Sequence, residues 1–177
     1  MTDRIAMKRI FLLTTLVCAS AANANGDCTL ALSPSSVSYE ARTLNMLQVS
    51  GHGAALSFGE RRVRLSVDCP RMQALEVRFD APAASRDTYR FGPGELQLRV
   101  VSARLDGRMI EWSREPDGVR NASLLRPGDR LRPGLSAALT QGQQWQVEMI
   151  VEPIVKRQAV SITDLSQFQA LGSFRLE

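Results

Sequence analysis

Strict alternation of apolar and polar residues marks one stretch of the chain most clearly. In the stretch of residues 61–69, an apolar side chain occupies every second position from Val63 to Cys69, with charged or polar residues between them. Because successive side chains of a β-strand point to opposite faces, this period of two predicts a strand that is buried on one side. The inward row is Val63, Leu65, Val67 and Cys69. A second alternating stretch, residues 28–32, begins with Cys28, so a Cys28–Cys69 bridge would pin the start of one strand to the end of the other.

The same period recurs along the rest of the chain. Residues 75–79 alternate strictly and residues 145–152 form the clearest late stretch of alternation, which predicts two further half-buried strands. Their inward rows are Leu75, Val77 and Phe79, and Trp145, Val147, Met149 and Val151. Short segments rich in valine and leucine, separated by turn residues, indicate an all-β domain.

Interruptions of the pattern indicate turns and irregularities. In residues 96–105 the apolar row shifts phase at Val101, which predicts a β-bulge with Val101, Ala103 and Leu105 continuing the inward row. The pair Asp106-Gly107 predicts a hairpin turn. We expect Pro70 to end the strand of residues 61–69, and Pro153 to mark a strand end or an edge position, because proline donates no hydrogen bond to a ladder.

The first residues predict a secretory signal peptide. Basic residues precede a short apolar run at residues 10–17, and small residues follow up to Ala22-Asn23-Ala24. A membrane anchor is the alternative, but the run falls well below the ~20 residues that cross a bilayer. We expect cleavage after Ala24, which leaves residues 25–177 as a single domain with no membrane span. Removing three basic residues and one acidic residue lowers the net charge from +4 to +2, so charge indicates no particular partner.

Cleavage would also remove Cys18 and leave Cys28 and Cys69 as the remaining cysteines. One intramolecular disulfide is then possible, and export implies an oxidising compartment. The alternative is a pair of free, buried thiols.

The sequence offers little catalytic chemistry. His52 is the single histidine, and neither a metal site nor a Ser-His-Asp triad has partners that we can place, so we expect no cofactor, no metal and no enzyme activity. The arginines of residues 120–132 could form a basic patch. Because proline, glycine and aspartate interrupt them, we interpret them as a solvated loop face and expect no nucleic-acid partner.

The last residues, 171–177, form an amphipathic stretch in which Phe174 and Leu176 share a face. Termini usually fray unless something ties them down. A strand here therefore needs a partner, either in its own sheet or in another protein.

The chain resembles a bacterial chaperone-usher fimbrial subunit, a pilin, in four features taken together. These are a signal peptide, a cysteine at the start of the first strand, a second cysteine about forty residues later, and the ending Gly172-Ser173-Phe174-Arg175-Leu176-Glu177. Phe91-Gly92-x-Gly94 and the Asp106-Gly107 hairpin resemble a less studied branch of that family. The resemblance implies an immunoglobulin-like β-sandwich that lacks its last strand. It also implies three partners: a periplasmic chaperone that donates a strand, an outer-membrane usher, and a neighbouring pilus subunit that replaces the chaperone.

By position, the resemblance assigns a donor-strand groove to Leu30, Leu32, Phe174 and Leu176, and a chaperone contact to the Glu177 carboxylate. The alternative is that the four apolar residues are plain core of a complete sandwich. Many family members have a tyrosine where Leu176 stands. Only Asn25-Gly26-Asp27 would precede Cys28, too few to span a groove that takes a strand of about five residues, so we expect a fimbrial tip subunit that contributes to cell adhesion.

Three classes of function remain on sequence alone. They are a fimbrial subunit carried through the periplasm to the cell surface, a stand-alone secreted β-sandwich that binds a ligand, and an enzyme on a β scaffold, the last having least support.

Overall fold

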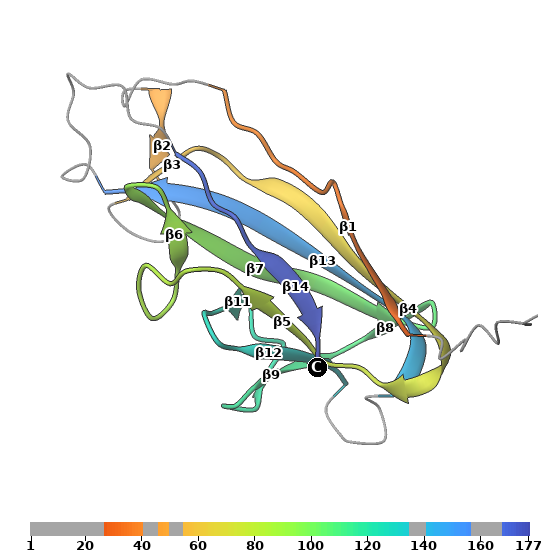
Figure 1. Cartoon of the computed structure of the whole chain (residues 1–177). Coiled ribbons are helices and arrows are strands. Elements are labelled where there is room, and N and C mark those ends of the chain that lie inside the picture. Colours follow the sequence, from red (N-terminus) through yellow and green to blue (C-terminus); the bar gives the residue numbers. More distant parts are fainter. Residues whose placement is uncertain (1–26, 41–45, 50–54, 135–140, 157–167) are drawn as a thin grey trace, which may run out of the picture.

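The computed structural model describes residues 27–40, 46–49, 55–134, 141–156 and 168–177. Every element of regular secondary structure in these residues is a β-strand (Figure 1). The predicted signal peptide, its cleavage site after Ala24 and His52 lie outside the described residues.

The larger sheet has four long or medium strands in the order β1, β4, β13, β7, all antiparallel to their neighbours. Their bounds are Thr29–Ser33, Arg61–Ala74, Gln141–Val155 and Gly94–Leu105. Short strands complete the sheet. β3 (Leu56–Ser57) and β2 (Gln48–Val49) extend it beside β13, while β6 (Tyr89–Phe91), β11 (Leu124–Leu125) and β8 (Arg108–Ile110) pair with the outer edge of β7.

The smaller sheet has the order β10, β9, β12, β5, β14 and is also antiparallel. Its strands are Val119–Arg120, Trp112–Glu115, Arg130–Pro133, Val77–Asp80 and Ser173–Leu176. The strand predicted from residues 171–177 is therefore β14, and its partner in the chain is β5.

The core lies between the two sheets, as the alternation predicted. Leu65 of β4, Val147 of β13 and Val77 of β5 are all completely buried. The domain is thus an all-β sandwich, which confirms the predicted fold class. In an immunoglobulin constant domain one sheet has strands A, B, E and D, and the other has C, F and G. The order β1, β4, β13, β7 matches A-B-E-D, and the adjacent pair β5 and β14 matches C and F.

The phase shift in β7 is a bulge, as predicted. Glu148 of β13 pairs with Ser102 and Met149 pairs with Val100, so Val101 is the extra residue. The prediction that Val101 faces inward was wrong. A bulged residue leaves the alternation, and Val101 is 39% exposed.

The prediction that Pro70 ends its strand was wrong, and of the two alternatives for Pro153 the strand end was wrong. β4 continues through Pro70 to Ala74, and β13 continues through Pro153 to Val155. Pro70 lies where the β4–β13 register shifts, and Pro153 lies between the last residue of β13 paired with β4 and the first paired with β3. Neither position needs a ladder N–H, so neither proline ends its strand.

The Asp106-Gly107 turn joins β7 to β8 as predicted, with positive φ angles of 48° and 79°. Both angles suit a type I′ hairpin. The Asp106 carboxylate also accepts hydrogen bonds from the backbone N–H groups of Gln143 and Gln144, at 3.0 and 2.8 Å.

Candidate functional site

The first and last strands end the two sheets on the same side of the sandwich. β1 is hydrogen-bonded to β4 and β14 to β5, and in the described part of the chain neither has a second neighbour. Cα atoms of β1 and β14 approach within 8 Å of each other, although the two strands are not paired (Figure 1). Each therefore presents one free edge to the same gap between the sheets.

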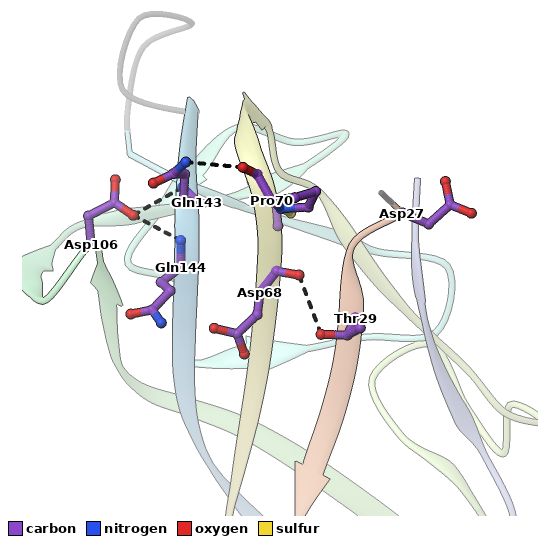
Figure 2. Close-up of a pocket in the computed structure, with 8 residues that line it drawn as sticks. Asp27, Thr29, Asp68, Pro70, Asp106, Gln143 and Gln144 are labelled. Atoms are coloured by element: carbon purple, nitrogen blue, oxygen red, sulfur yellow. Dashed lines mark hydrogen bonds between the residues drawn. The ribbon is translucent and has the colours of Figure 1, made fainter. Parts of the chain in front are cut away.

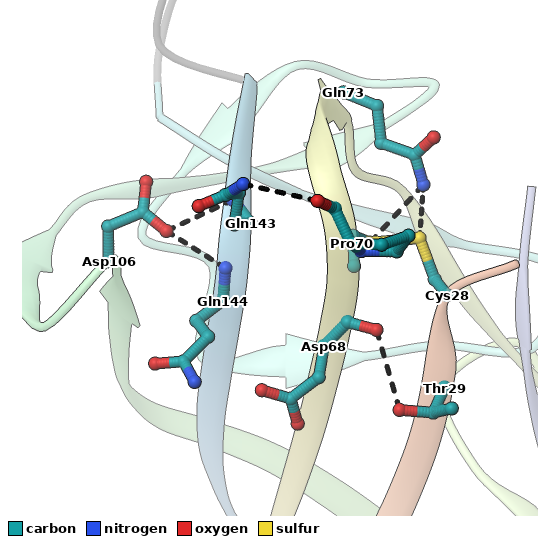
Figure 3. Close-up of a disulfide and its surroundings, with 9 residues drawn as sticks. Cys28, Thr29, Asp68, Pro70, Gln73, Asp106, Gln143 and Gln144 are labelled. Carbon is teal, nitrogen blue, oxygen red and sulfur yellow. Dashed lines mark hydrogen bonds between the residues drawn. A yellow bond between two sulfur atoms is a disulfide. The ribbon is translucent and has the colours of Figure 1, made fainter. Parts of the chain in front are cut away.

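The disulfide fixes one end of this arrangement, and its formation confirms the predicted Cys28–Cys69 pairing. The sulfur atoms are 2.03 Å apart and the Cα atoms 4.2 Å apart. The Gln73 amide lies over the bridge and contacts both sulfur atoms (Figure 3). The start of β1 is thus covalently attached to β4.

The inward side chains of the two edge strands are only half-buried. They are Leu30 and Leu32 on β1 and Phe174 and Leu176 on β14, and all four pack against the core. The corresponding side chains of the neighbouring strands are closed off: Leu65 is 0% and Val67 1% exposed on β4, and Val77 is 0% exposed on β5. We call Leu30, Leu32, Phe174 and Leu176 the apolar seam.

The backbone of β14 offers hydrogen bonds to the same gap. The Glu177 N–H donates to the Glu76 carbonyl at 2.9 Å, in continuation of the β14–β5 register. Hydrogen-bonded and non-bonded pairs alternate in an antiparallel ladder, so the backbone N–H and C=O groups of Arg175 and Ser173 also point to β5. The N–H and C=O groups of Phe174 and Leu176 therefore point to the free edge.

The same argument applies to β1. The 4.2 Å Cα separation of Cys28 and Cys69 is that of a non-hydrogen-bonded antiparallel pair, which is about 4.5 Å rather than 5.5 Å. Along the β1–β4 register, Leu30 and Leu32 also stand in non-hydrogen-bonded pairs with β4. Their backbone N–H and C=O groups therefore point away from β4. All four seam residues thus present an apolar side chain to one gap, together with backbone groups that pair with no strand among the described residues. An extended strand with apolar residues at alternate positions satisfies both.

Sequence reasoning missed the continuation of the seam. Val37 and Tyr39 after β1, and Phe168 and Ala170 before β14, are half-buried at alternate positions and pack against the core. The Tyr39 hydroxyl donates to the Val151 carbonyl at 3.2 Å, and burial raises the pKa of Tyr39 to about 12. The alternation of Phe168 and Ala170 with polar Gln169 was the available signal in the sequence.

The predicted chaperone contact, Glu177, lies at the end of β14. Its side chain forms an ion pair with Arg78 of β5, with a nitrogen–oxygen distance of 3.2 Å. Chaperone binding by its carboxylate stays a prediction.

Most arginines of residues 120–132 have acidic partners. Arg126 pairs with Asp87, and both Arg130 and Arg132 pair with Glu76. Beside them, the buried Arg114 contacts Asp117 and Asp129 and donates to the Leu124 carbonyl at 2.9 Å. The Arg114 hydrogen bond lowers the pKa of Asp117 below its usual range. These pairs tie turns of the smaller sheet together.

A shallow hollow lies at the disulfide end of the larger sheet (Figure 2). Its lining includes the carboxylates of Asp27, Asp68 and Asp106. The Asp106 carboxylate already accepts hydrogen bonds from the two backbone N–H groups described above. Within the described residues, no group of three or more His, Cys, Asp or Glu side chains is arranged to hold a metal ion. Nor do those residues contain a helix long and apolar enough to cross a membrane.

No protein-family model, no curated protein and no solved structure matches this chain. Functional inference therefore rests on the geometry of the seam.

Proposed function

We propose that this protein is a structural subunit of a fimbrium, assembled through the chaperone-usher pathway by donor-strand complementation. The observation that carries the proposal is the apolar seam, where the side chains and the backbone groups of Leu30, Leu32, Phe174 and Leu176 all face one gap. An exposed sheet edge beside apolar side chains is an aggregation hazard, and a strand supplied by another protein removes it.

In this proposal the partners act in sequence. A periplasmic chaperone inserts a strand between β1 and β14 after export, and an outer-membrane usher exchanges the chaperone for a strand of the neighbouring subunit. The finished fibre stands on the cell surface and contributes to cell adhesion. The disulfide supports this route, since disulfides persist in oxidising compartments such as the periplasm.

Expression in a bacterial periplasm tests the proposal. Produced alone, the protein is expected to aggregate or be degraded. When it is co-expressed with a periplasmic fimbrial chaperone, the protein is expected to purify with that chaperone as a soluble one-to-one complex. Soluble, stable monomer in the absence of any chaperone would contradict the proposal and favour the stand-alone secreted sandwich.

A further inference from the structure

The segment that leads into β14 has one inward position without a side chain, next to the apolar seam. Counting back from Leu176, inward positions fall at Phe174, Gly172, Ala170 and Phe168. A Cβ atom built on Gly172 would lie 2.2 Å from Cζ and 2.7 Å from Cε2 of Phe79. Real Cβ atoms do not approach other atoms this closely, so the Phe79 ring occupies the space that a side chain at this position would need.

This ring belongs to a continuous row of aromatic side chains. Phe79 meets Tyr89 edge to face, with ring centres 5.0 Å apart and planes at 81°. On its other side Phe79 meets Phe174 at 4.8 Å and 44°. Tyr89 is completely buried, whereas Phe79 and Phe174 are half-buried and Gly172 is exposed. The aromatic row therefore begins in the core and ends at the seam.

Resting on the proposed function, we propose that Phe79 is a specificity-determining residue of the strand-binding site. Its ring, uncovered because position 172 is glycine, contacts the donated side chain that lies opposite Gly172. The occupant is an extended strand with a large aromatic residue at that one inward position. Hydrogen bonding fixes its form, because only an extended chain reaches the free backbone groups of Phe174 and Leu176 while placing alternate residues inward.

The preference for an aromatic residue follows from the ring geometry. Aromatic pairs favour edge-to-face or offset contacts with centroids 4.5–7 Å apart, and they add about 0.5–1.5 kcal/mol beyond area burial. A phenylalanine opposite Gly172 meets the half-buried rings of both Phe79 and Phe174. We therefore expect phenylalanine to bind roughly 2- to 10-fold more tightly than leucine at this position alone.

Synthetic nine-residue peptides that alternate valine with serine provide the test. A phenylalanine or a leucine replaces valine at each inward position in turn, and affinity for the full-length mature protein is measured by fluorescence anisotropy. The expected result is a phenylalanine preference at one position, which Phe79→Leu removes. Gly172→Ala, which displaces the ring, removes it too. Met109→Leu, at a 62% exposed site on β8, is the matched control and keeps the preference.

The outcomes separate this inference from the proposed function. Peptides that bind with equal affinity for phenylalanine and leucine at every position, or a preference that survives in Phe79→Leu, would overturn the role of Phe79 and leave strand binding intact. If no peptide binds, both fail. Should Phe79→Leu not fold, the wild-type protein still decides, through nuclear Overhauser contacts between the Phe79 ring and the peptide phenylalanine. Their absence overturns the inference.

Discussion

Arg114 shows how single residues hold the smaller sheet together. Its side chain is 5% exposed and its partners, Asp117 and Asp129, lie on two different turns. A buried ion pair gains little over an apolar replacement of both partners, but removing one partner leaves an uncompensated charge inside the protein. The ion pairs of Arg114 therefore add little to the net free energy of unfolding, but they hold the two turns in place.

Replacing Arg114 by methionine is expected to lower the free energy of unfolding by about 3–5 kcal/mol, because Asp129 loses its ion-pair partner and the Leu124 carbonyl loses the hydrogen bond from Arg114. Arg62→Met is the matched control. Arg62 also pairs with a carboxylate, that of Glu148, but its side chain is 65% exposed, so we expect a loss of about 0–1 kcal/mol. Urea unfolding measures both, and equal losses would contradict this account.

Replacing both Cys28 and Cys69 by serine is expected to lower the free energy of unfolding by about 4 kcal/mol, since the bridge closes a long loop in the unfolded chain. Gln73→Ala removes the amide that covers the bridge and is expected to change stability by less than about 0.5 kcal/mol. A double serine variant as stable as the wild type would show that the bridge does not stabilise the fold.

Glu95 gives the stability a pH dependence. The Lys156 hydrogen bond lowers the pKa of Glu95, with Thr88 adding to the effect. A carboxyl whose pKa is lower in the folded state stabilises the fold above its unfolded pKa, and this contribution is lost as the pH falls through the folded pKa. Between about pH 5 and pH 3, the wild type is expected to lose more stability than Glu95→Gln does. Parallel pH curves for the two proteins would contradict this.

In each of the two edge strands, β1 and β14, neighbouring side chains point alternately to the core and to the outer face. Leu32→Asp places a charge in the apolar seam, and we expect it to weaken binding of a strand peptide at least about tenfold. Ala31→Asp places the same charge on the exposed outer face of β1 and is expected to leave binding within about twofold. Fluorescence anisotropy measures both. Equal effects would show that β1 does not line the binding site.

Removing residues 174–177 tests the other wall. The truncation takes away most of β14 and uncovers the buried Val77 on β5. We expect the truncated protein to be degraded in the periplasm and to lose chaperone capture, measured by co-purification. A truncated protein that stays soluble and monomeric would instead indicate that β14 is dispensable.

Alternation in the sequence predicted the long strands β4, β7 and β13, because every second side chain of a half-buried strand faces the core. It missed β12, which overlaps the residues interpreted as a loop face. Leu65, Val147 and Val77 all face the core as predicted. The continuation of β4 through Pro70 could not be predicted, since it depends on where the neighbouring strands pair. The contact of Gly172 with Phe79 joins residues 93 positions apart in the chain, and no local pattern specifies it.

At the scale of the whole molecule, the sandwich has one closed side and one open side. The outer edge of β7 is covered by β6, β11 and β8, whereas β1 and β14 face each other without pairing. A strand inserted between them needs the two edges about 9.5 Å apart, twice the usual strand spacing. Because their Cα atoms now approach within 8 Å, insertion must widen the gap. β1, which is tied at the disulfide, is the strand that we expect to pivot.

Amide hydrogen exchange, resolved by residue with NMR, tests the central claim that the two edges accept a strand. In the free protein the N–H groups of Leu30, Leu32, Phe174 and Leu176 are predicted to exchange rapidly, while those of Ala31 and Arg175 are protected by β4 and β5. Adding the peptide of highest affinity is predicted to protect all four seam amides. Seam amides that are already protected in the free monomer, or that stay unprotected when the peptide is bound, would contradict the account.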